Sequence, residues 1–548
     1  MACTKPWKNK AKKIKAGTLQ KLIDGKAKAY LSYKLAFIDQ KGELNFDFEK
    51  TKLGDYDQTK VVRLLNSLGI KALNARLPKV SKGSQAELVA APVIPGKPNA
   101  VIKTAEEALI AAYLCNPGQR SYEVGDWADL ATELKEKNVL KIFQDIEVPL
   151  ISVLKNMQKR GIKIDLVWLS DLSKQLDKRI KQLEKEIHKH AGGEFNISSP
   201  KQLQEVLFET LQIPTENIKK NKKSGGMSTA ANELEKMRKL HPIIELIFEY
   251  RELTKLKSTY VDALPLLVSK ADGRIHTTYS QTIAATGRLS SINPNLQNIP
   301  IRTDLGNEVR KAFIAEKGKV LLSLDYSQIE LRIAASLSED PEMIKIFKSG
   351  GDFHTATAAR IFNVPEDKVT PNQRRDAKTI NFSVLYGVSA FGLSSRSDMS
   401  RAEAGEHIKQ YFEVFKKLKK YIDGTIEKTR KQGFITNSLG RIRYLPEINA
   451  SNFAVRGAAE RQAFNMPLQS LAADIIKMAM IEIDKKHPDA QMLLSVHDEL
   501  VFETEKNKAE QQAKYIKNIM ENVYKLKVPI EVHAKSGDNW SEMEKIKI

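Results

Sequence analysis

Apolar residues recur at helical spacing in the first half of the chain. After Asp165 they fall three or four positions apart, with Lys and Glu on the opposite face: Leu169, Leu172, Leu176, Ile180, Leu183 and Ile187. Such a stripe marks the buried face of an amphipathic helix. The pattern predicts a long helix from Asp165 that packs against a second helix. A second helical stretch is predicted from about residue 231 to residue 260.

Two short apolar runs further along the chain predict buried strands that end near an aspartate. Val320–Leu324 precedes Asp325, and a hairpin of residues 492–496 and 499–503 turns tightly at Asp498. Most turn aspartates only accept hydrogen bonds from backbone amides, so each acid alone has that simple explanation. Together they provide hard oxygen ligands of the kind that two divalent ions require in phosphoryl transfer.

One predicted helix carries a graded face. Arg374, Lys378, Phe382 and Tyr386 are each four residues apart and therefore lie on one side, cations first and aromatics last. Cations stabilise phosphate oxygens and aromatic rings stack on bases, which is the order of groups in a nucleoside triphosphate. An isolated surface helix with two core aromatics would look the same. The two aspartates favour the nucleotide interpretation.

A third polar stripe precedes an apolar helical stretch. Arg461, Asn465 and Gln469 are again four residues apart, although Pro467 leaves open whether they share one face. A solvated face would explain them. If the stripe is buried, its polar groups need partners, and a nucleic-acid minor groove would supply them.

The amino-acid composition indicates that the protein binds a polyanionic partner. The 548 residues include 88 Lys and Arg against 67 Asp and Glu, a net charge of +21. Nucleic acid is the commonest partner of so basic a chain, although a merely basic surface is the alternative. The two cysteines, Cys3 and Cys115, form no disulfide framework, and no apolar run reaches the roughly 18 residues that span a bilayer. We therefore expect a cytoplasmic, nucleoid-associated protein with no membrane partner, and organelle targeting is left open.

Several motifs, in order, resemble those of family A DNA polymerases, the bacterial DNA polymerase I group. The resemblance covers roughly residues 104–548. It is carried by Asp325–Arg332, Arg374–Gly387 and Val496–Leu500, which are similar to motifs A, B and C, and by Leu253–Tyr260, Thr286–Ser291, Pro294–Pro300 and Gly537–Trp540. The resemblance implies an α+β right-hand fold, with an antiparallel palm sheet and helical fingers and thumb.

The resemblance also implies roles for individual residues. Asp325, Asp498 and the Tyr326 carbonyl would bind two Mg²⁺ ions, for which Mn²⁺ substitutes, and Lys378 would protonate the leaving pyrophosphate. The incoming deoxynucleoside triphosphate would contact Arg374, His354, Phe382, Tyr386, Glu330 and Gln328. Primer–template DNA would contact Arg288, Gln297, Asn298, Lys255, Arg461, Asn465, Gln469, His497 and Glu499.

The same resemblance predicts how the chain is divided. Residues 1–78 resemble the C-terminal end of a 5′-nuclease domain, 79–103 form a linker rich in Pro and Gly, and 104–140 resemble the end of an exonuclease domain. The thumb would be 141–262, the palm 263–339 with 451–548, and the fingers 340–450. No Asp-x-Glu pair of a proofreading site occurs between Lys79 and Leu140. We therefore expect a monomer that lacks proofreading and 5′-nuclease activities.

Two other functions fit parts of the sequence. A single-subunit RNA polymerase shares the palm and both aspartates, but Glu330 would close the space that a ribose 2′-hydroxyl needs. A catalytically inert DNA-binding relict would not need every catalytic side chain, and all of those expected are present. The predicted function is therefore DNA-dependent addition of deoxynucleotides to a primer.

Overall fold

The computed structural model describes residues 98–548, except Arg120, Glu123, Asn217, residues 221–224, Arg302, Arg396 and Asp398. The chain separates into two compact units, residues 1–90 and 91–548, and all described residues belong to the second. The predicted nuclease remnant, 1–78, lies outside the described residues, as does most of the predicted linker, 79–103.

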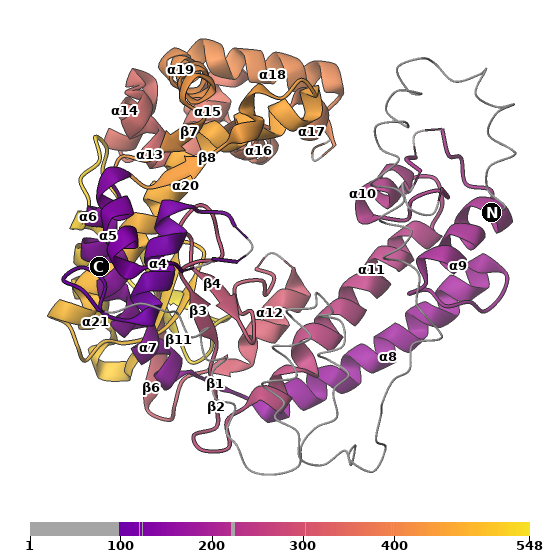
Figure 1. Cartoon of the computed structure of the whole chain (residues 1–548). Coiled ribbons are helices and arrows are strands. Elements are labelled where there is room, and N and C mark those ends of the chain that lie inside the picture. Colours follow the sequence, from indigo (N-terminus) through magenta and orange to yellow (C-terminus); the bar gives the residue numbers. More distant parts are fainter. Residues whose placement is uncertain are drawn as a thin grey trace, which may run out of the picture. The chain divides into compact units, whose positions relative to one another are not determined.

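An antiparallel sheet of five strands lies in this second unit, in the order β12-β11-β6-β10-β9 (Figure 1). Its strands are β6 (Lys319–Tyr326), β9 (Gln491–Val496), β10 (Glu499–Glu505), β11 (Val532–Gly537) and β12 (Glu544–Lys545). The apolar runs that predicted strands form β6, β9 and β10, and the tight turn joins the last two as expected. Helices with an antiparallel sheet confirm the α+β fold class.

The two faces of this sheet pack into different cores, because side chains alternate along a strand. Leu322 and Leu324 join a core with helices α13 (Ile329–Ser338), α20 (Phe453–Lys486) and α21 (Ala509–Asn522). Leu321 belongs to a second core with α8 and α11. Alternation from Leu321 puts Asp325 on this second face.

The predicted long helix is α8 (Leu166–Ala191), which packs against α11 (Ile243–Leu256). The Asp165 side chain caps α8 by accepting from the Trp168 amide, and the predicted Leu/Ile stripe faces the core. The second predicted stretch is not one helix: α10 (Ala231–Leu234) ends early and α11 starts only after Pro242. Proline lacks an amide hydrogen and disfavours helical backbone in the residue before it, which explains the break.

The helices between α13 and α20 form a cluster with a short hairpin at its end (Figure 1, orange). Helix α16 begins with a capping box at Thr370, and Gly387 just after its end takes the left-handed backbone (φ +63°) that glycine adopts without strain and that terminates helices. The elements are α14 (Pro341–Lys348), α15 (Phe353–Ile361), α16 (Pro371–Leu385), α17 (Ala390–Ser394), α18 (Arg401–Val414), α19 (Lys416–Gln432), β7 (Phe434–Thr436) and β8 (Ile442–Tyr444).

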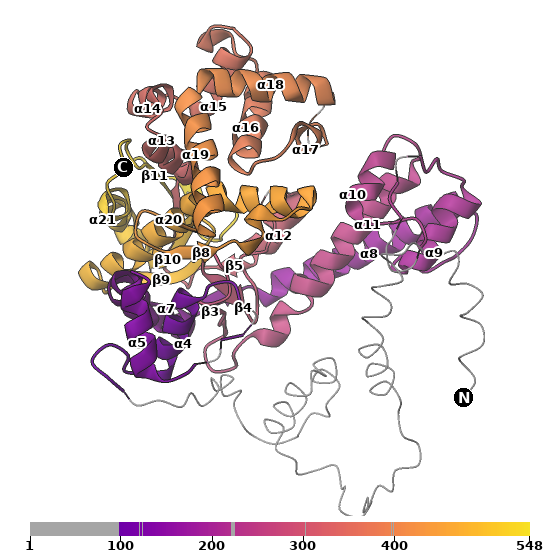
Figure 2. The same ribbon diagram turned by 45° about the horizontal axis from the view of Figure 1, so that its top comes forward.

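The helices at the start of the described region lie against this body (Figure 2, indigo). Helices α4 and α5 share a small core with Ile442 of β8, and α7 packs on α20 and β9. The remaining elements are α4 (Ala105–Cys115), α5 (Trp127–Glu136), α6 (Leu140–Ile142), α7 (Val148–Arg160), β1 (Ile162–Ile164), α9 (Pro200–Glu205), β2 (Arg274–Ile275), β3 (Thr278–Ser280), β4 (Ser290–Ile292), α12 (Asp304–Lys311) and β5 (Phe313–Ile314). Among the described helices, none has the length and apolar character to cross a bilayer.

Candidate active site

Strand pairing brings the two aspartates to one edge of the sheet. β6 and β10 run antiparallel with Asp325 opposite Glu499, and the Tyr326 amide donates to the main-chain oxygen of Asp498 at 3.1 Å. His497, in the turn between β9 and β10, takes a left-handed backbone (φ 54°) that lets the strand reverse at once. Asp498 therefore lies beside the end of β6.

Among the described residues, neither carboxyl group forms an ion pair with a cation. Burial raises the pKa of Asp325 to about 7, and repulsion from Glu499 and Asp498 adds to the shift, while Lys535 opposes it. Burial also raises the pKa of Asp498, against the attraction of Arg288. No three Asp, Glu, His or Cys side chains in the described chain lie close enough to hold a metal ion by themselves. Any bound cation would need further ligands from main-chain carbonyls, solvent or substrate.

An open cleft of about 820 Å³ separates these carboxylates from the graded face of α16. Arg374, Lys378, Phe382 and Tyr386 all line it, so the predicted helical face is turned toward the aspartates. Other predicted residues that line the same cleft are Arg288, Gln297, Asn298, Tyr326, Gln328, Glu330, His354 and His497.

The cationic end of the cleft is held by partners from α15. Asp352 accepts from Arg374 Nε at 2.7 Å. The Asn381 amide nitrogen lies 3.0 Å from His354 Nδ1, while its oxygen accepts from Thr357, so the amide donates and the ring proton is on Nε2. Burial lowers the pKa of His354 to about 4, and Lys378 and Arg374 add to this against Asp352. At neutral pH the ring is therefore an uncharged Nε2–H donor.

The aromatic end is tied to helix α13 by one carboxylate, that of Glu330. Glu330 accepts from the Tyr386 hydroxyl at 2.8 Å and from Arg288 Nη2 at 2.6 Å. Burial raises the pKa of Glu330, although Arg288 opposes the shift. The Phe382 ring lies 5.7 Å from the His354 ring. Tyr386 and Arg288, predicted to contact different ligands, thus share a partner.

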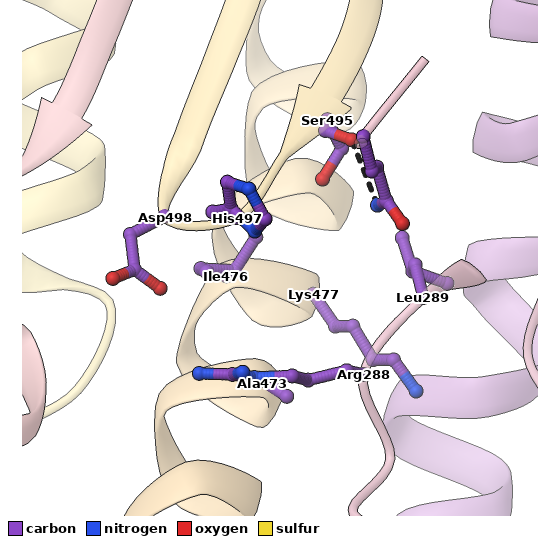
Figure 3. Close-up of a pocket in the computed structure, with 9 residues that line it drawn as sticks. Arg288, Leu289, Ala473, Ile476, Lys477, Ser495, His497 and Asp498 are labelled. Atoms are coloured by element: carbon purple, nitrogen blue, oxygen red, sulfur yellow. Dashed lines mark hydrogen bonds between the residues drawn. The ribbon is translucent and has the colours of Figure 1, made fainter. Parts of the chain in front are cut away.

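Beside Asp498, a smaller cavity of about 80 Å³ has mostly polar side chains around it (Figure 3). Gln297 donates to the Ser495 carbonyl at 3.1 Å and accepts from the Ser291 amide, which fixes its orientation. Arg288 and His497 line this cavity as well as the larger cleft.

The third polar stripe also faces open space. Helix α20 runs unbroken through Pro467, and Arg461, Asn465 and Gln469 line a cavity of about 320 Å³ next to Tyr386. The three side chains therefore share a face. Asn465 Oδ1 is buried and has no hydrogen-bond partner among the described residues.

Two predicted contacts, Lys255 and Glu499, do not line the cleft, and the side chain of Tyr326, whose carbonyl is the predicted ligand, points into the core. Lys255 is exposed on α11 and does not line the cleft. Glu499 Oε1 accepts from Ser323 at 2.5 Å and from Trp540 Nε1 at 3.2 Å, which holds it behind the cleft. The Tyr326 hydroxyl donates to the Met520 carbonyl inside the core, so its ring points away from the aspartates.

The chain matches the sequence model of DNA polymerase family A over residues 167–542. It belongs to this family. Similar curated proteins include the thermostable DNA polymerase I of Thermus thermophilus, 45% identical over 459 residues that cover 79% of this chain and 55% of that protein. DNA polymerase I of Deinococcus radiodurans is 45% identical, covering 80% of this chain and 48% of that protein. The chain thus spans about half the length of these relatives.

A solved structure has the same fold. It is the POL domain of Pol1 from M. smegmatis in complex with DNA primer-template and dNTP, with a TM-score of 0.74 and 40% identity over 79% of this chain and 81% of that one. The right-hand polymerase fold predicted from the motifs is therefore confirmed.

Some residues in and around the cleft are not predicted from the sequence, because their neighbours are distant in the chain. His533 on β11 is directly opposite Asp325 and lines the cleft. Asp352 and Asn381 orient Arg374 and His354. Alternation in β11 was the one local signal for His533, but strand register cannot be read from the sequence of one strand.

Proposed function

We propose that this chain is a DNA-dependent DNA polymerase that adds deoxynucleotides to the 3′-hydroxyl of a primer. One observation carries the proposal: a single cleft has the Asp325–Asp498 pair on one side and the graded face of α16 on the other. The M. smegmatis relative is described with primer-template DNA and dNTP, and the same ligands are proposed here.

Two Mg²⁺ ions are the proposed cofactors, with Mn²⁺ as a substitute. Asp325, Asp498 and the Tyr326 carbonyl would hold them, since they supply hard oxygen ligands. The raised pKa of Asp325, about 7, fits a site whose carboxylates need cations nearby. Bound ions of this kind lower the pKa of an attacking hydroxyl and neutralise charge on the leaving phosphates.

The triphosphate would bind at the cationic end of α16. Arg374, fixed by Asp352, and the neutral His354 Nε2–H are donors for phosphate oxygens. Lys378 would protonate the leaving pyrophosphate, and its loss should reduce the rate on the order of 10²–10⁴-fold. Gln328 lies in the same cleft and would add a further polar contact.

The sugar and base would bind at the aromatic end. Phe382 would stack on the incoming nucleotide. Glu330 would occupy the space beside the sugar and exclude a ribose 2′-hydroxyl. Tyr386, held by Glu330 at 2.8 Å, would occupy the place of the template base until the helices around α16 move.

The duplex would lie along the two smaller cavities. Arg288, Gln297, Asn298, His497 and Gln469 would contact the primer terminus and the minor groove, with Arg461, Asn465, Lys255 and Glu499 in support. The Asn465 side chain, which lines the second of these cavities, would hydrogen bond to base edges in the minor groove.

We propose the same division as the motifs imply, with thumb 141–262, fingers 340–450 and palm 263–339 with 451–548, in a monomer. Proofreading and 5′-nuclease activities are predicted to be absent from this chain. Removal of a mismatched 3′ nucleotide in Mg²⁺ without pyrophosphate would contradict the first of these.

Primer extension tests the proposal. The unmutated chain should extend a DNA primer on a DNA template with deoxynucleotides and poorly with ribonucleotides, and Asp498→Ala should remove almost all activity. Efficient ribonucleotide use would favour the RNA polymerase alternative. Unchanged extension by Asp498→Ala would refute the catalytic assignment.

A further inference from the structure

Four charged side chains form a network that is almost completely buried behind the cleft. Glu147, Arg441, Asp474 and Lys477 are each at most 1% exposed. Arg441 Nη2 lies 2.5 Å from both Glu147 Oε1 and Asp474 Oδ1, and Lys477 Nζ lies 2.7 Å from Glu147 Oε1. Two cations and two carboxylates therefore neutralise each other in the interior.

The network joins distant parts of the described chain. Glu147 ends the π-helical turn before α7, Arg441 precedes β8 in its hairpin, and Asp474 and Lys477 are neighbours on α20. Replacing such buried ion clusters by apolar residues is often neutral or stabilising in other proteins. Stability alone is therefore a weak explanation for it, and its contacts indicate another.

Those contacts converge on one loop, residues 281–287. Gln281 Nε2 donates to Glu147 Oε2 at 2.6 Å and to the Glu147 carbonyl at 2.9 Å. Gly287 (φ +81°) rests on Arg441 so closely that an added Cβ would be 2.7 Å from its Nε. The Tyr113 hydroxyl of α4 donates to the Ala284 carbonyl at 2.8 Å. The loop is thus held at its start, middle and end.

The next residue is Arg288, which reaches into both cavities beside Asp498. Its guanidinium donates to Glu330, and it lines the 80 Å³ cavity together with Lys477 of the network (Figure 3). Within the described part of the chain, Arg288 forms no hydrogen bond or ion pair with the network itself. Its position depends on the loop that the network holds.

We propose that Glu147 and Arg441 are positioning residues, which hold loop 281–287 so that Arg288 meets the primer terminus. Tyr113 does the same from α4. The segment predicted as a relict of an exonuclease domain thereby acquires a role in synthesis. This inference rests on the proposed polymerase function, because only then does Arg288 face a primer.

A double-mutant cycle with the full chain tests this. Glu147→Gln keeps the shape of the side chain but removes its charge. It should slow single-nucleotide addition on the order of 10–100-fold, as misplacement of a positioned group does. In an Arg288→Ala background the same change should slow it no further, because the side chain being positioned is gone.

The matched control is Glu503→Gln. Glu503 is also a buried carboxylate, paired with Arg274 at 2.7 Å near the far end of β10. The Glu503→Gln variant should lower the unfolding temperature but leave the rate of nucleotide addition unchanged. Tyr113→Phe removes one loop contact and no charge, so it is the variant of choice if Glu147→Gln does not fold. It should give a smaller loss that again vanishes with Arg288→Ala.

Hydrogen exchange of the 281–288 peptide gives a second readout that needs no activity. Exchange should increase in Glu147→Gln and Tyr113→Phe and not in Glu503→Gln. The inference would be overturned if the rate loss of Glu147→Gln or Tyr113→Phe multiplied with that of Arg288→Ala. Unchanged hydrogen exchange of the 281–288 peptide in these two variants would overturn it as well. An unmutated chain that extends no primer would instead refute the proposed function, and exchange would then test the loop contacts alone.

Discussion

At the scale of single residues, the balance of buried charge separates two kinds of carboxylate. Burial raises the pKa of Asp325 and Asp498, because no cation pairs with them closely. Burial would also raise the pKa of Glu147, but Lys477 and Arg441 outweigh it and lower the pKa to about 2. Unpaired buried carboxylates indicate a site for external cations, and paired ones hold the structure together.

Glu330 is the residue on which substrate choice should depend. Glu330→Ala removes the carboxylate that would exclude a ribose 2′-hydroxyl. We expect discrimination against ribonucleotides to fall by about 10–200-fold, the range for one small group in a pocket. Competition between deoxy- and ribonucleotides in single-turnover extension measures it.

Tyr386→Phe is the control for Glu330→Ala. It removes the 2.8 Å hydrogen bond to Glu330 but leaves the space beside the sugar filled. Discrimination should therefore persist in this variant. An equal loss in both variants would mean that the hydrogen bond, and not the volume of Glu330, selects the sugar.

Glu147 should make stability depend on acid pH. Its pKa is about 2 in the folded chain and about 4.3 when unfolded, so its contribution is complete above pH 4.5 and is lost as pH falls toward 2. Glu147→Gln should therefore cost about 3–5 kcal/mol at pH 7, as removal of one buried partner does. The difference in unfolding temperature between the two proteins should shrink below pH 4.5.

Thermal unfolding at pH 7, 5, 4 and 3 measures this difference. Glu427→Gln is the control, since Glu427 pairs with Lys431 at the surface and both side chains are at least 67% exposed. Its effect should be small at every pH. A Glu147→Gln difference that stayed constant down to pH 3 would contradict an ionised Glu147.

At the scale of elements, the turn between β9 and β10 places both His497 and Asp498. His497 has φ 54°, a region that β-branched residues tolerate poorly and Asn tolerates well. His497→Val should therefore destabilise the chain by about 1–2 kcal/mol, whereas His497→Asn should not. Urea unfolding distinguishes them, and equal midpoints would mean that the turn relaxes.

Features that depend on residues close together in the sequence could be predicted, and features that depend on residues distant in the chain could not. The graded face of α16 and the β9–β10 hairpin were predicted because spacing and turn residues lie within one segment. The prediction of one helical stretch across Pro242 is wrong, although proline is a local signal. His533 and the Glu147 network could not be predicted, because they depend on which segments become neighbours.

At the scale of the molecule, the net charge of +21 should govern DNA affinity. Each phosphate contact releases counterions, so the logarithm of the binding constant falls with the logarithm of salt by about 0.9 per contact. With six to ten contacts, affinity should fall about 10³–10⁵-fold between about 50 and 200 mM salt. Fluorescence anisotropy of a labelled primer–template measures the slope.

Variants of two residues on α20 test whether the salt dependence of DNA binding reports individual phosphate contacts. Arg461 and Asn465 line the same cavity one helical turn apart, and only Arg461 is charged. Arg461→Ala should lower affinity and reduce the slope by about 1 if it meets a phosphate. Asn465→Ala should lower affinity with the slope unchanged, because an uncharged amide that hydrogen bonds to a base releases no ion. An equal change of slope in both would mean that DNA does not follow this face of α20.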